Sequence, residues 1–137
     1  MNAAYLDACC FIYLIEGEAP WREAVRARLE TLPASAELVT SSLSRLECRS
    51  KPLRDRNAVL LAAYEAAFAK THVVDISAAI VERATELRAR YGFRSPDAIH
   101  LATAIDVGAA LFLTGDASLA RCSEVAVAVL TMVAATP

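Results

Sequence analysis

The chain has 137 residues, 56% of them hydrophobic, and a formal net charge of −2. This length fits one domain, expected to comprise residues 1–137, and the high apolar content with only four glycines excludes a disordered or low-complexity chain. The charge excludes a protein that binds nucleic acid over its whole surface, because such binding needs concentrated basic side chains. A local basic patch remains open, and we expect a compact globular protein.

The cysteines and the apolar runs predict an intracellular location. Cys9, Cys10, Cys48 and Cys122 show neither CxxC spacing nor the density of a secreted disulfide scaffold. Asp7 interrupts the N-terminal apolar stretch, and no apolar run reaches the roughly 20 residues of a membrane span. We therefore expect reduced, mostly buried thiols in a cytoplasmic protein that is not exported and does not enter a membrane.

Short apolar runs alternate with helical patterns along the chain. The spacing predicts strands at residues 2–7, 37–42, 72–77, 109–116 and 124–133, and helices at residues 8–18, 21–32, 41–51, 55–70, 77–92 and 95–108. Strands that alternate with helices usually form a parallel sheet covered on both faces. The expected fold is α/β, a three-layer α/β/α sandwich around a central, mainly parallel sheet of four to five strands.

Residues that begin or end helices support this division. Serines able to cap a helix occur at the start of the third predicted helix, and Ser77 and Ser95 are expected as N-caps of the last two. Pro96 is expected at the first helical position after Ser95, and Gly92 lies just past the end of the preceding helix. These signals predict that residue 97 lies in the first turn of a helix.

Four carboxylates occupy positions near the ends of these elements. Asp7 and Asp116 follow predicted strands, while Glu47 and Asp97 lie near the starts of predicted helices. Ligands of an open α/β sheet gather outside the carboxyl ends of its strands. Asp7 is notable because apolar residues surround it on both sides, and a buried charge needs a partner or a metal ion.

Three of these acids also have purely structural explanations. Asp97 is favoured in the first turn of a helix by the helix dipole. Asp116 could cap a short helix over residues 117–122, and Glu47 could pair with Arg45 or Arg49. These explanations remain open for each residue taken alone.

Convergence of the carboxylates would have a chemical consequence. Each like-charged pair about 4 Å apart costs on the order of 4 kcal/mol at an effective dielectric constant near 20, so the cluster would need a cation or shared protons. Oxygen ligands select Mg²⁺ or Mn²⁺ over zinc. A metal of this kind orients a phosphate, lowers the pKa of bound water and neutralises charge on the leaving oxygen. The pattern therefore favours phosphodiester hydrolysis.

Four motifs in order resemble a known family. These are YLDACCFIYLIEG at residues 5–17, SLSRLECRSKPLR at 42–54, SPDAIHLATA at 95–104 and LFLTGDASL at 111–119. Together they look like the PIN domain, and specifically like the VapC toxins of bacterial toxin–antitoxin pairs. Each motif is weak alone, but their order and spacing extend the resemblance from Tyr5 to the last predicted strand.

The resemblance implies a PIN-like fold and a set of site residues. The catalytic residues would be Asp7, Glu47, Asp97, Asp116 and Thr114, with the four acids as metal ligands. The family commonly has Thr or Ser after its first Asp, whereas this chain has Ala8, so a hydroxyl that supports Asp7 is expected to be absent. Gly115 replaces a residue that is often polar.

The resemblance also implies a function. It is that of a Mg²⁺- or Mn²⁺-dependent endoribonuclease toxin that hydrolyses RNA phosphodiester bonds, in tRNA or other structured RNA, and is neutralised by a cognate VapB-type antitoxin. A homodimer is expected, with a larger toxin–antitoxin assembly as a further possibility. One alternative, motivated by Ala8, is a catalytically weakened PIN-like module that binds RNA or an antitoxin. A phosphoacceptor domain fits poorly, because the first strand lacks a following acidic pair and no lysine is suitably placed.

Basic residues offer candidate RNA contacts. The expected phosphate-binding residues are Arg45, Arg49, Lys51, Arg54 and Arg94, and a second cluster consists of Arg83, Arg88, Arg90 and Arg94. The alternative is a solvated helix end, which is usual for a run of charges. Few aromatic residues lie among these basic residues, which suggests recognition of RNA shape and backbone more than stacking on single bases.

His100 and two aromatic residues leave further alternatives open. His100 follows Asp97 by three residues on one helix face, so it could bind metal or act as a base, but we expect a packed residue bonded to a backbone carbonyl. Tyr13 and Trp21 are expected in the core, on an apolar face that could also receive an antitoxin helix.

Overall fold

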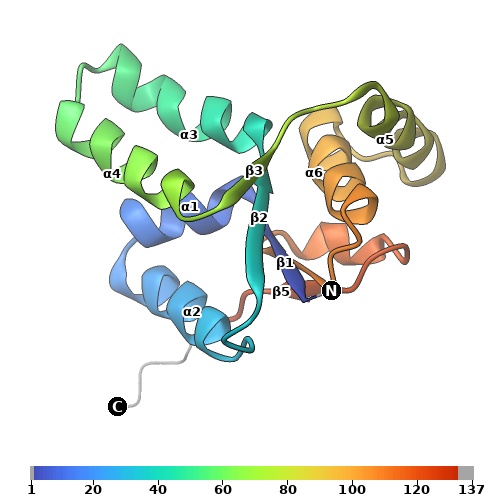
Figure 1. Ribbon diagram of the computed structural model, residues 1–137, viewed down its shortest axis with the longest axis horizontal. Coiled ribbons are helices and arrows are strands. Elements are labelled where there is room, and N and C mark those ends of the chain that lie inside the picture. The colour runs from blue at the N-terminus through green and yellow to red at the C-terminus, as the bar shows by residue number, and fades with distance from the viewer. Residues whose placement is uncertain (1, 133–137) are drawn as a thin grey trace.

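The computed structural model describes residues 2–132 and contains a five-stranded parallel sheet (Figure 1). The strands are β1 (Ala3–Leu6), β2 (Glu37–Ser41), β3 (His72–Val74), β4 (Leu111–Thr114) and β5 (Val127–Val129), in the spatial order β3-β2-β1-β4-β5. All four strand pairings are parallel, so the predicted α/β fold and its parallel sheet are confirmed. The last strand is shorter than expected, and residue 133 lies outside the described residues.

Helices cover both faces of the sheet. They are α1 (Ala8–Ile15), α2 (Ala19–Glu30), α3 (Ser42–Arg54), α4 (Ala58–Ala69), α5 (Ala78–Tyr91) and α6 (Ser95–Asp106), with a short 3₁₀ helix η1 (Ala117–Arg121). Figure 1 shows the first four helices on one side of the sheet and α5 and α6 on the other. The predicted three-layer arrangement is therefore confirmed. Among residues 2–132, no helix is both long and apolar enough to cross a bilayer.

The helix ends follow local sequence in most places. The Ser41 hydroxyl accepts a hydrogen bond from the Leu43 amide at 3.0 Å, and the Ser77 hydroxyl accepts one from the Ile80 amide at 3.2 Å, so both serines are N-caps. Gly92 ends α5 with a φ of 75°, a conformation that costs glycine little.

The N-cap predicted for α6 is wrong by one residue. Arg94 occupies the N-cap position, Ser95 is the first helical residue and Pro96 the second. The Ser95 hydroxyl instead accepts a hydrogen bond from the Arg88 guanidinium on α5, a tertiary contact that replaces local capping. Asp97 still lies in the first turn of α6, as predicted.

Each face of the sheet has its own apolar core. Successive side chains of a strand point to opposite faces; Tyr5 of β1 packs among side chains of α5 and α6, whereas Leu6 packs among those of α1, α2, α3 and α4. The Tyr5 ring stacks on Phe112 with centroids 5.2 Å apart. Both faces of β1 are therefore buried, as the apolar run predicted.

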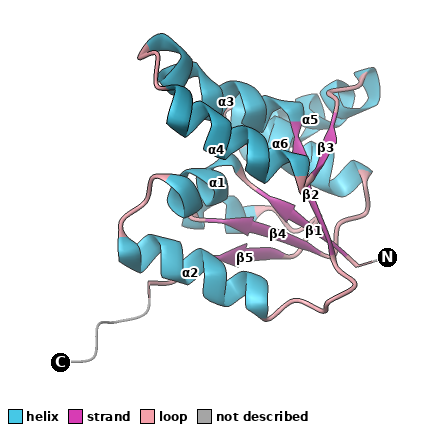
Figure 2. Ribbon diagram, turned by 60° about the vertical axis from the view of Figure 1, so that its left-hand side comes forward, coloured by secondary structure: helices cyan, strands magenta, loops and turns pink. Residues whose placement is uncertain are grey.

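The parallel topology places the strand ends together. Leu6 pairs with Leu113, and Tyr5 pairs with Val39, so β1, β2 and β4 end at the same edge. Asp7 follows the central strand directly, and α3 begins directly after β2. Figure 2 shows the twist of the sheet from β5 to β3. Residues of β1, β4, α3 and α6 can therefore meet at one edge.

Candidate active site

A pocket at the carboxyl edge of the sheet brings the four predicted acids together. Its volume is about 560 Å³, and its lining includes Asp7, Glu47, Asp97 and Asp116. Asp7 comes from the β1–α1 junction, Glu47 from α3, Asp97 from α6 and Asp116 from the segment after β4. Sequence positions more than 100 residues apart thus contribute to one concave surface.

Asp7 is held by the start of a helix and by a neighbouring strand. The side chain is the N-cap of α1, and its Oδ1 accepts a hydrogen bond from the Ala8 amide at 2.8 Å. The Thr114 hydroxyl donates to Oδ2 at 2.7 Å, and the Cys9 thiol lies 3.7 Å from the same oxygen. Asp7 is 8% exposed, so these donors compensate for lost hydration.

The expected absence of a supporting hydroxyl near Asp7 is wrong. Ala8 carries none, but the Thr114 hydroxyl reaches the carboxylate from β4. The Cys9 sulfur also accepts a hydrogen bond from the Gly115 amide at 3.2 Å, which ties α1 to the end of β4. The hydroxyl that bonds Asp7 thus comes from β4 and not from the next residue in the sequence.

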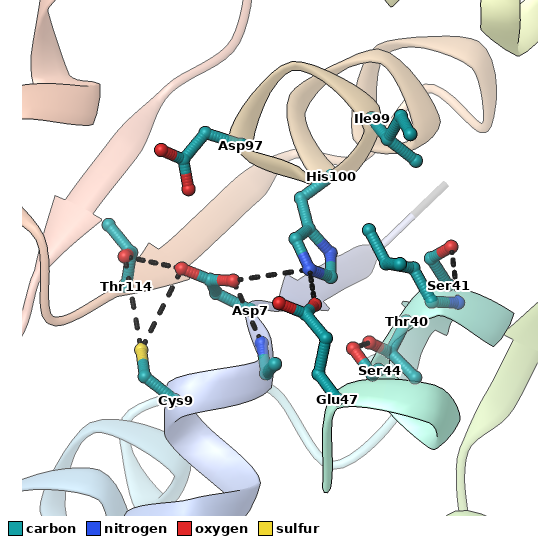
Figure 3. A network of polar contacts seen from close by, with 12 residues as sticks. Asp7, Cys9, Thr40, Ser41, Ser44, Glu47, Asp97, Ile99, His100 and Thr114 are labelled. Carbon is teal, nitrogen blue, oxygen red and sulfur yellow. Dashed lines mark hydrogen bonds and ion pairs between the residues drawn. The ribbon is translucent and has the colours of Figure 1, made fainter. Parts of the chain in front are cut away.

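Glu47 pairs with a histidine and not with its neighbouring arginines. The Glu47 carboxylate oxygen Oε1 lies 2.6 Å from Nε2 of His100, on α6. The same Nε2 lies 3.6 Å from Oδ1 of Asp7, and Nδ1 lies 2.7 Å from the Tyr5 hydroxyl. Figure 3 shows the imidazole pointing from α6 toward both carboxylates. His100 is packed, as expected, but the predicted bond to a backbone carbonyl is wrong, because its partners are side chains.

The surroundings of Asp97 in this pocket disfavour the charged form of its carboxyl group. Burial raises the pKa of the Asp97 carboxyl, and the charges of Asp7 and Asp116 raise it further. The Arg94 guanidinium, whose Nε lies 3.4 Å from Oδ2, acts in the opposite direction. Asp7 and Asp116 are thus close enough to repel the Asp97 carboxylate, and a cation in the pocket would relieve this repulsion.

Asp116 caps η1, which was one of its two predicted explanations. Its Oδ1 accepts hydrogen bonds from the Ser118 amide at 2.9 Å and the Ser118 hydroxyl at 2.7 Å. The Asp116 amide donates to the Thr114 hydroxyl oxygen at 3.1 Å. Both capping bonds use one carboxylate oxygen, so capping and a role in the pocket are compatible.

The donor chemistry of the pocket suits a hydrated hard cation. Within residues 2–132, no three His, Cys, Asp or Glu side chains are arranged to hold one metal ion. Mg²⁺ commonly binds proteins through one or two carboxylates and keeps several water ligands, so it does not require three protein ligands. Four acids around one pocket, one with a raised pKa, fit this mode of binding.

The predicted RNA-binding residues fall into two groups. Arg45 and Arg49 of α3 both donate to Glu65 of α4, with N–O distances of 3.1 Å, so they join two helices. Lys51 and Arg54 are exposed at the end of α3, where Arg54 contacts Asp55. Arg94 lines the pocket, and its side chain is 81% exposed.

The second basic cluster is also partly engaged. Arg83 and Arg90 of α5 lie 3.9 Å and 3.7 Å from carboxylate oxygens of Glu124. Arg88 donates to the Ser95 hydroxyl. Arg94 is therefore the member of this cluster that lies at the pocket.

Cys9 and Tyr13 are among the pocket-lining residues that the sequence did not assign to the site. Cys9 and Tyr13 follow Asp7 at positions separated by one helical turn on α1, a spacing that could have indicated a shared face. The Tyr13 ring stacks on Trp21 with centroids 4.8 Å apart. A Cβ atom at position 115 would lie 2.9 Å from the Tyr13 ring, which explains the glycine there.

Comparison with known proteins identifies the family. The profile of the PIN domain matches residues 4–125, and the chain therefore belongs to the PIN domain family. No curated protein matches the sequence significantly.

Several solved structures share this fold. A toxin–antitoxin complex from Klebsiella pneumoniae has a chain that is 23% identical, with a TM-score of 0.75, and the match covers 95% of this chain and 99% of that one. VapBC2 from Rickettsia felis, bound to a DNA fragment from its promoter, has 15% identity, a TM-score of 0.80 and coverage of 94% and 99%. Mycobacterium tuberculosis VapC20, a sarcin–ricin loop cleaving toxin, has 16% identity, a TM-score of 0.70 and coverage of 98% and 99%.

Proposed function

We propose that this protein is a metal-dependent endoribonuclease toxin of the VapC type, which hydrolyses phosphodiester bonds of tRNA or another structured RNA. The observation that carries the proposal is the gathering of Asp7, Glu47, Asp97 and Asp116 around one pocket at the carboxyl edge of the sheet. The raised pKa of Asp97 supports it, because carboxylates that repel one another favour cation binding. Membership of the PIN domain family and the toxins among the structural neighbours add support.

In this proposal each residue has a defined task. A Mg²⁺ or Mn²⁺ ion, when bound, would orient the scissile phosphate, activate water and neutralise the leaving oxygen. Asp7, held by the Ala8 amide and Thr114, would hold the ion together with Asp97, Glu47 and Asp116. Arg94, exposed at the pocket, would contact an RNA phosphate.

The same proposal implies partners for this protein. A VapB-type antitoxin would neutralise the activity, and the toxin would form a homodimer within a larger toxin–antitoxin assembly in the cytoplasm. Lys51 and Arg54, which are exposed, would extend the basic surface for RNA beyond Arg94. Arg45 and Arg49 contribute less to this surface, because Glu65 already neutralises part of their charge.

The alternative of a catalytically weakened binding module loses part of its motive. That alternative depended on the missing hydroxyl directly after Asp7; Ala8 leaves it missing, but the Thr114 hydroxyl bonds the same carboxylate and so weakens the argument. It would regain support if the protein bound RNA but neither bound Mn²⁺ nor cleaved RNA.

The test is cleavage of total bacterial tRNA with Mn²⁺ and with EDTA, comparing wild type with Asp7→Asn. We expect wild type to cleave in Mn²⁺ alone and Asp7→Asn to lose cleavage while its circular dichroism spectrum is unchanged. Asp75→Asn is the matched control, because Asp75 follows β3 but is exposed and does not line the pocket. Equal cleavage by wild type and Asp7→Asn, after removal of contaminating nucleases, would contradict the proposal.

A further inference from the structure

A chain of three side chains, of which Tyr5 and His100 are buried, crosses from the sheet to the pocket. Tyr5 of β1 contacts Nδ1 of His100 through its hydroxyl at 2.7 Å, and Nε2 of His100 contacts Oε1 of Glu47 at 2.6 Å. Tyr5 and His100 are 0% and 1% exposed. Both ring nitrogens of this histidine therefore have partners, and one of the partners is an acid of the pocket.

The partners determine which nitrogen carries the hydrogen. An ionised carboxylate only accepts hydrogen bonds, and Nε2 faces two of them, Glu47 at 2.6 Å and Asp7 at 3.6 Å, so Nε2 must be the donor. Burial raises the pKa of Tyr5 well above its usual value, so the phenol keeps its proton and can donate it to Nδ1. In a neutral imidazole, these contacts select the Nε2–H tautomer.

Glu47 needs such a partner to take a defined position. Its side chain is 32% exposed and extends from α3, whereas Asp7 extends from the end of β1, and like charges favour their separation. A buried donor that lies within 4 Å of both acids opposes this separation. Figure 3 shows one nitrogen of the imidazole in contact with both the Glu47 and the Asp7 carboxylates.

We propose that His100 is a positioning residue of this pocket: held by the Tyr5 hydroxyl as the Nε2–H tautomer, it fixes the Glu47 carboxylate beside Asp7 for cation binding. The proposal rests on the metal dependence proposed above and adds two residues, His100 and Tyr5, that act through Glu47. Partners of this kind, which orient a ligand without touching the metal, typically change metal affinity 10–100-fold when they are replaced.

The main test compares the Mn²⁺ affinities of His100→Gln and His100→Asn by titration calorimetry. A glutamine amide can place an N–H near the position of Nε2, whereas an asparagine amide is too short to reach Glu47. We expect His100→Asn to bind Mn²⁺ about 10–100-fold more weakly than wild type and His100→Gln to regain most of the affinity. Equal affinities for wild type and both variants would overturn the proposal.

His72 provides a matched control. It is the other histidine of the chain, and it forms an exposed pair with Glu37, with Nδ1 2.9 Å from Oε1, on the edge strand β3 and outside the pocket lining. His72→Asn and His72→Gln should bind Mn²⁺ as wild type does. A loss of affinity in His72→Asn equal to that in His100→Asn would overturn the specific role of His100.

Tyr5→Phe tests the tautomer without changing His100. The variant removes one oxygen and keeps the ring that stacks on Phe112, so it should fold even if His100→Asn does not. Nitrogen NMR of wild type should show His100 with its hydrogen on Nε2, and Tyr5→Phe should show a mixture of tautomers and weaker Mn²⁺ binding. A hydrogen on Nδ1 in wild type would overturn the proposal.

The two proposals can fail separately. If wild type binds Mn²⁺ and the His100 variants behave as expected but no tRNA is cleaved, the ribonuclease function is wrong and the positioning role stands. If tRNA is cleaved but His100→Asn binds Mn²⁺ as tightly as wild type does, the positioning role is wrong and the ribonuclease function stands.

Discussion

The Thr114 hydroxyl connects two acids of the pocket. It donates to Oδ2 of Asp7 at 2.7 Å and accepts a hydrogen bond from the Asp116 amide at 3.1 Å. Thr114 is fully buried, so water does not reach its hydroxyl to take over either hydrogen bond. A single hydroxyl thus orients one carboxylate and the backbone that carries another.

Thr114→Val should therefore destabilise the protein. The valine leaves a buried carboxylate oxygen without its hydroxyl donor, and we expect a loss of about 1.5–3 kcal/mol in the free energy of unfolding. Urea unfolding followed by circular dichroism measures this change. Thr114→Ser keeps the hydroxyl and should lose less unfolding free energy than Thr114→Val. A Thr114→Val variant as stable as wild type would show that the hydrogen bond from Thr114 to Asp7 does not stabilise the fold.

The raised pKa of Asp97 predicts a pH-dependent effect on stability. Its folded-state pKa lies above the ordinary value of 3.8, so the folded state binds this proton more tightly than the unfolded state. The associated stability is present below pH 3.8 and is lost as the pH rises through the folded-state pKa. At pH 7 the ionised Asp97 carboxylate therefore opposes folding.

Asp97→Asn should consequently be more stable than wild type at pH 7, and the difference should shrink as the pH falls toward 3.8. Urea unfolding at pH 7, 5.5 and 4 without divalent ions gives this comparison. Asp75→Asn, which changes an exposed acid outside the pocket, serves as the control. A wild type that is more stable than Asp97→Asn at pH 7 would show that Asp97 has a favourable partner in the folded state.

At the scale of elements, the junctions after β1, β2 and β4 form the site. Each parallel strand ends at the same edge, and each of these junctions begins a helix with a polar cap: Asp7 for α1, Ser41 for α3 and Asp116 for η1. α6 adds Asp97 and His100 from one face, because these residues are one turn apart. The site is thus assembled from helix starts around the central strand.

The packing of α1 against the end of β4 places the Tyr13 ring where a side chain at position 115 would lie. The Tyr13 ring, held by stacking on Trp21, lies 2.9 Å from where a Cβ atom would be. Gly115→Ala should therefore lose about 1–3 kcal/mol of unfolding free energy. Urea unfolding measures the loss, and Tyr13→Leu should restore part of it in the double variant. An unchanged stability of Gly115→Ala would show that Tyr13 moves at little cost.

At the scale of the whole molecule, four acids from distant parts of the chain gather at one pocket, with Arg94 beside them. The net charge of −2 does not reveal this local concentration of acids, nor the exposed basic side chains of Lys51 and Arg54 outside the pocket. A cation in the pocket would neutralise repulsion among residues from four elements. Binding there would consequently stabilise the entire fold.

Mn²⁺ should therefore raise the melting temperature of wild type. A ligand at 100 times its dissociation constant adds about 2.7 kcal/mol to the free energy of unfolding when it binds only the folded state. Differential scanning calorimetry with Mn²⁺ and with EDTA measures the change, and Asp7→Asn should show little of it. An equal Mn²⁺-dependent shift in both proteins would place the bound ion elsewhere.

The sequence by itself determined the order of strands and helices and the positions of the four acids. Apolar periodicity and helix-end residues act locally, so they reveal elements without tertiary information, and parallel strands necessarily end at one edge. This reasoning placed Asp7 and Asp116 at one edge, and the resemblance to the PIN domain added Glu47 and Asp97 to the same site. It misplaced the N-cap of α6 because Ser95 has a tertiary partner, Arg88.

Only the tertiary structure decided which side chains pair. Thr114 reaches Asp7 across 107 positions, His100 reaches Glu47 across 53, and Glu65 draws Arg45 and Arg49 toward α4. Such pairs depend on the rotation of each helix about its axis and on the strand beside which it packs. No local pattern encodes these two quantities, so the acids and Thr114 could be named from the sequence, whereas the pairing of His100 with Glu47 and of Glu65 with the two arginines could not.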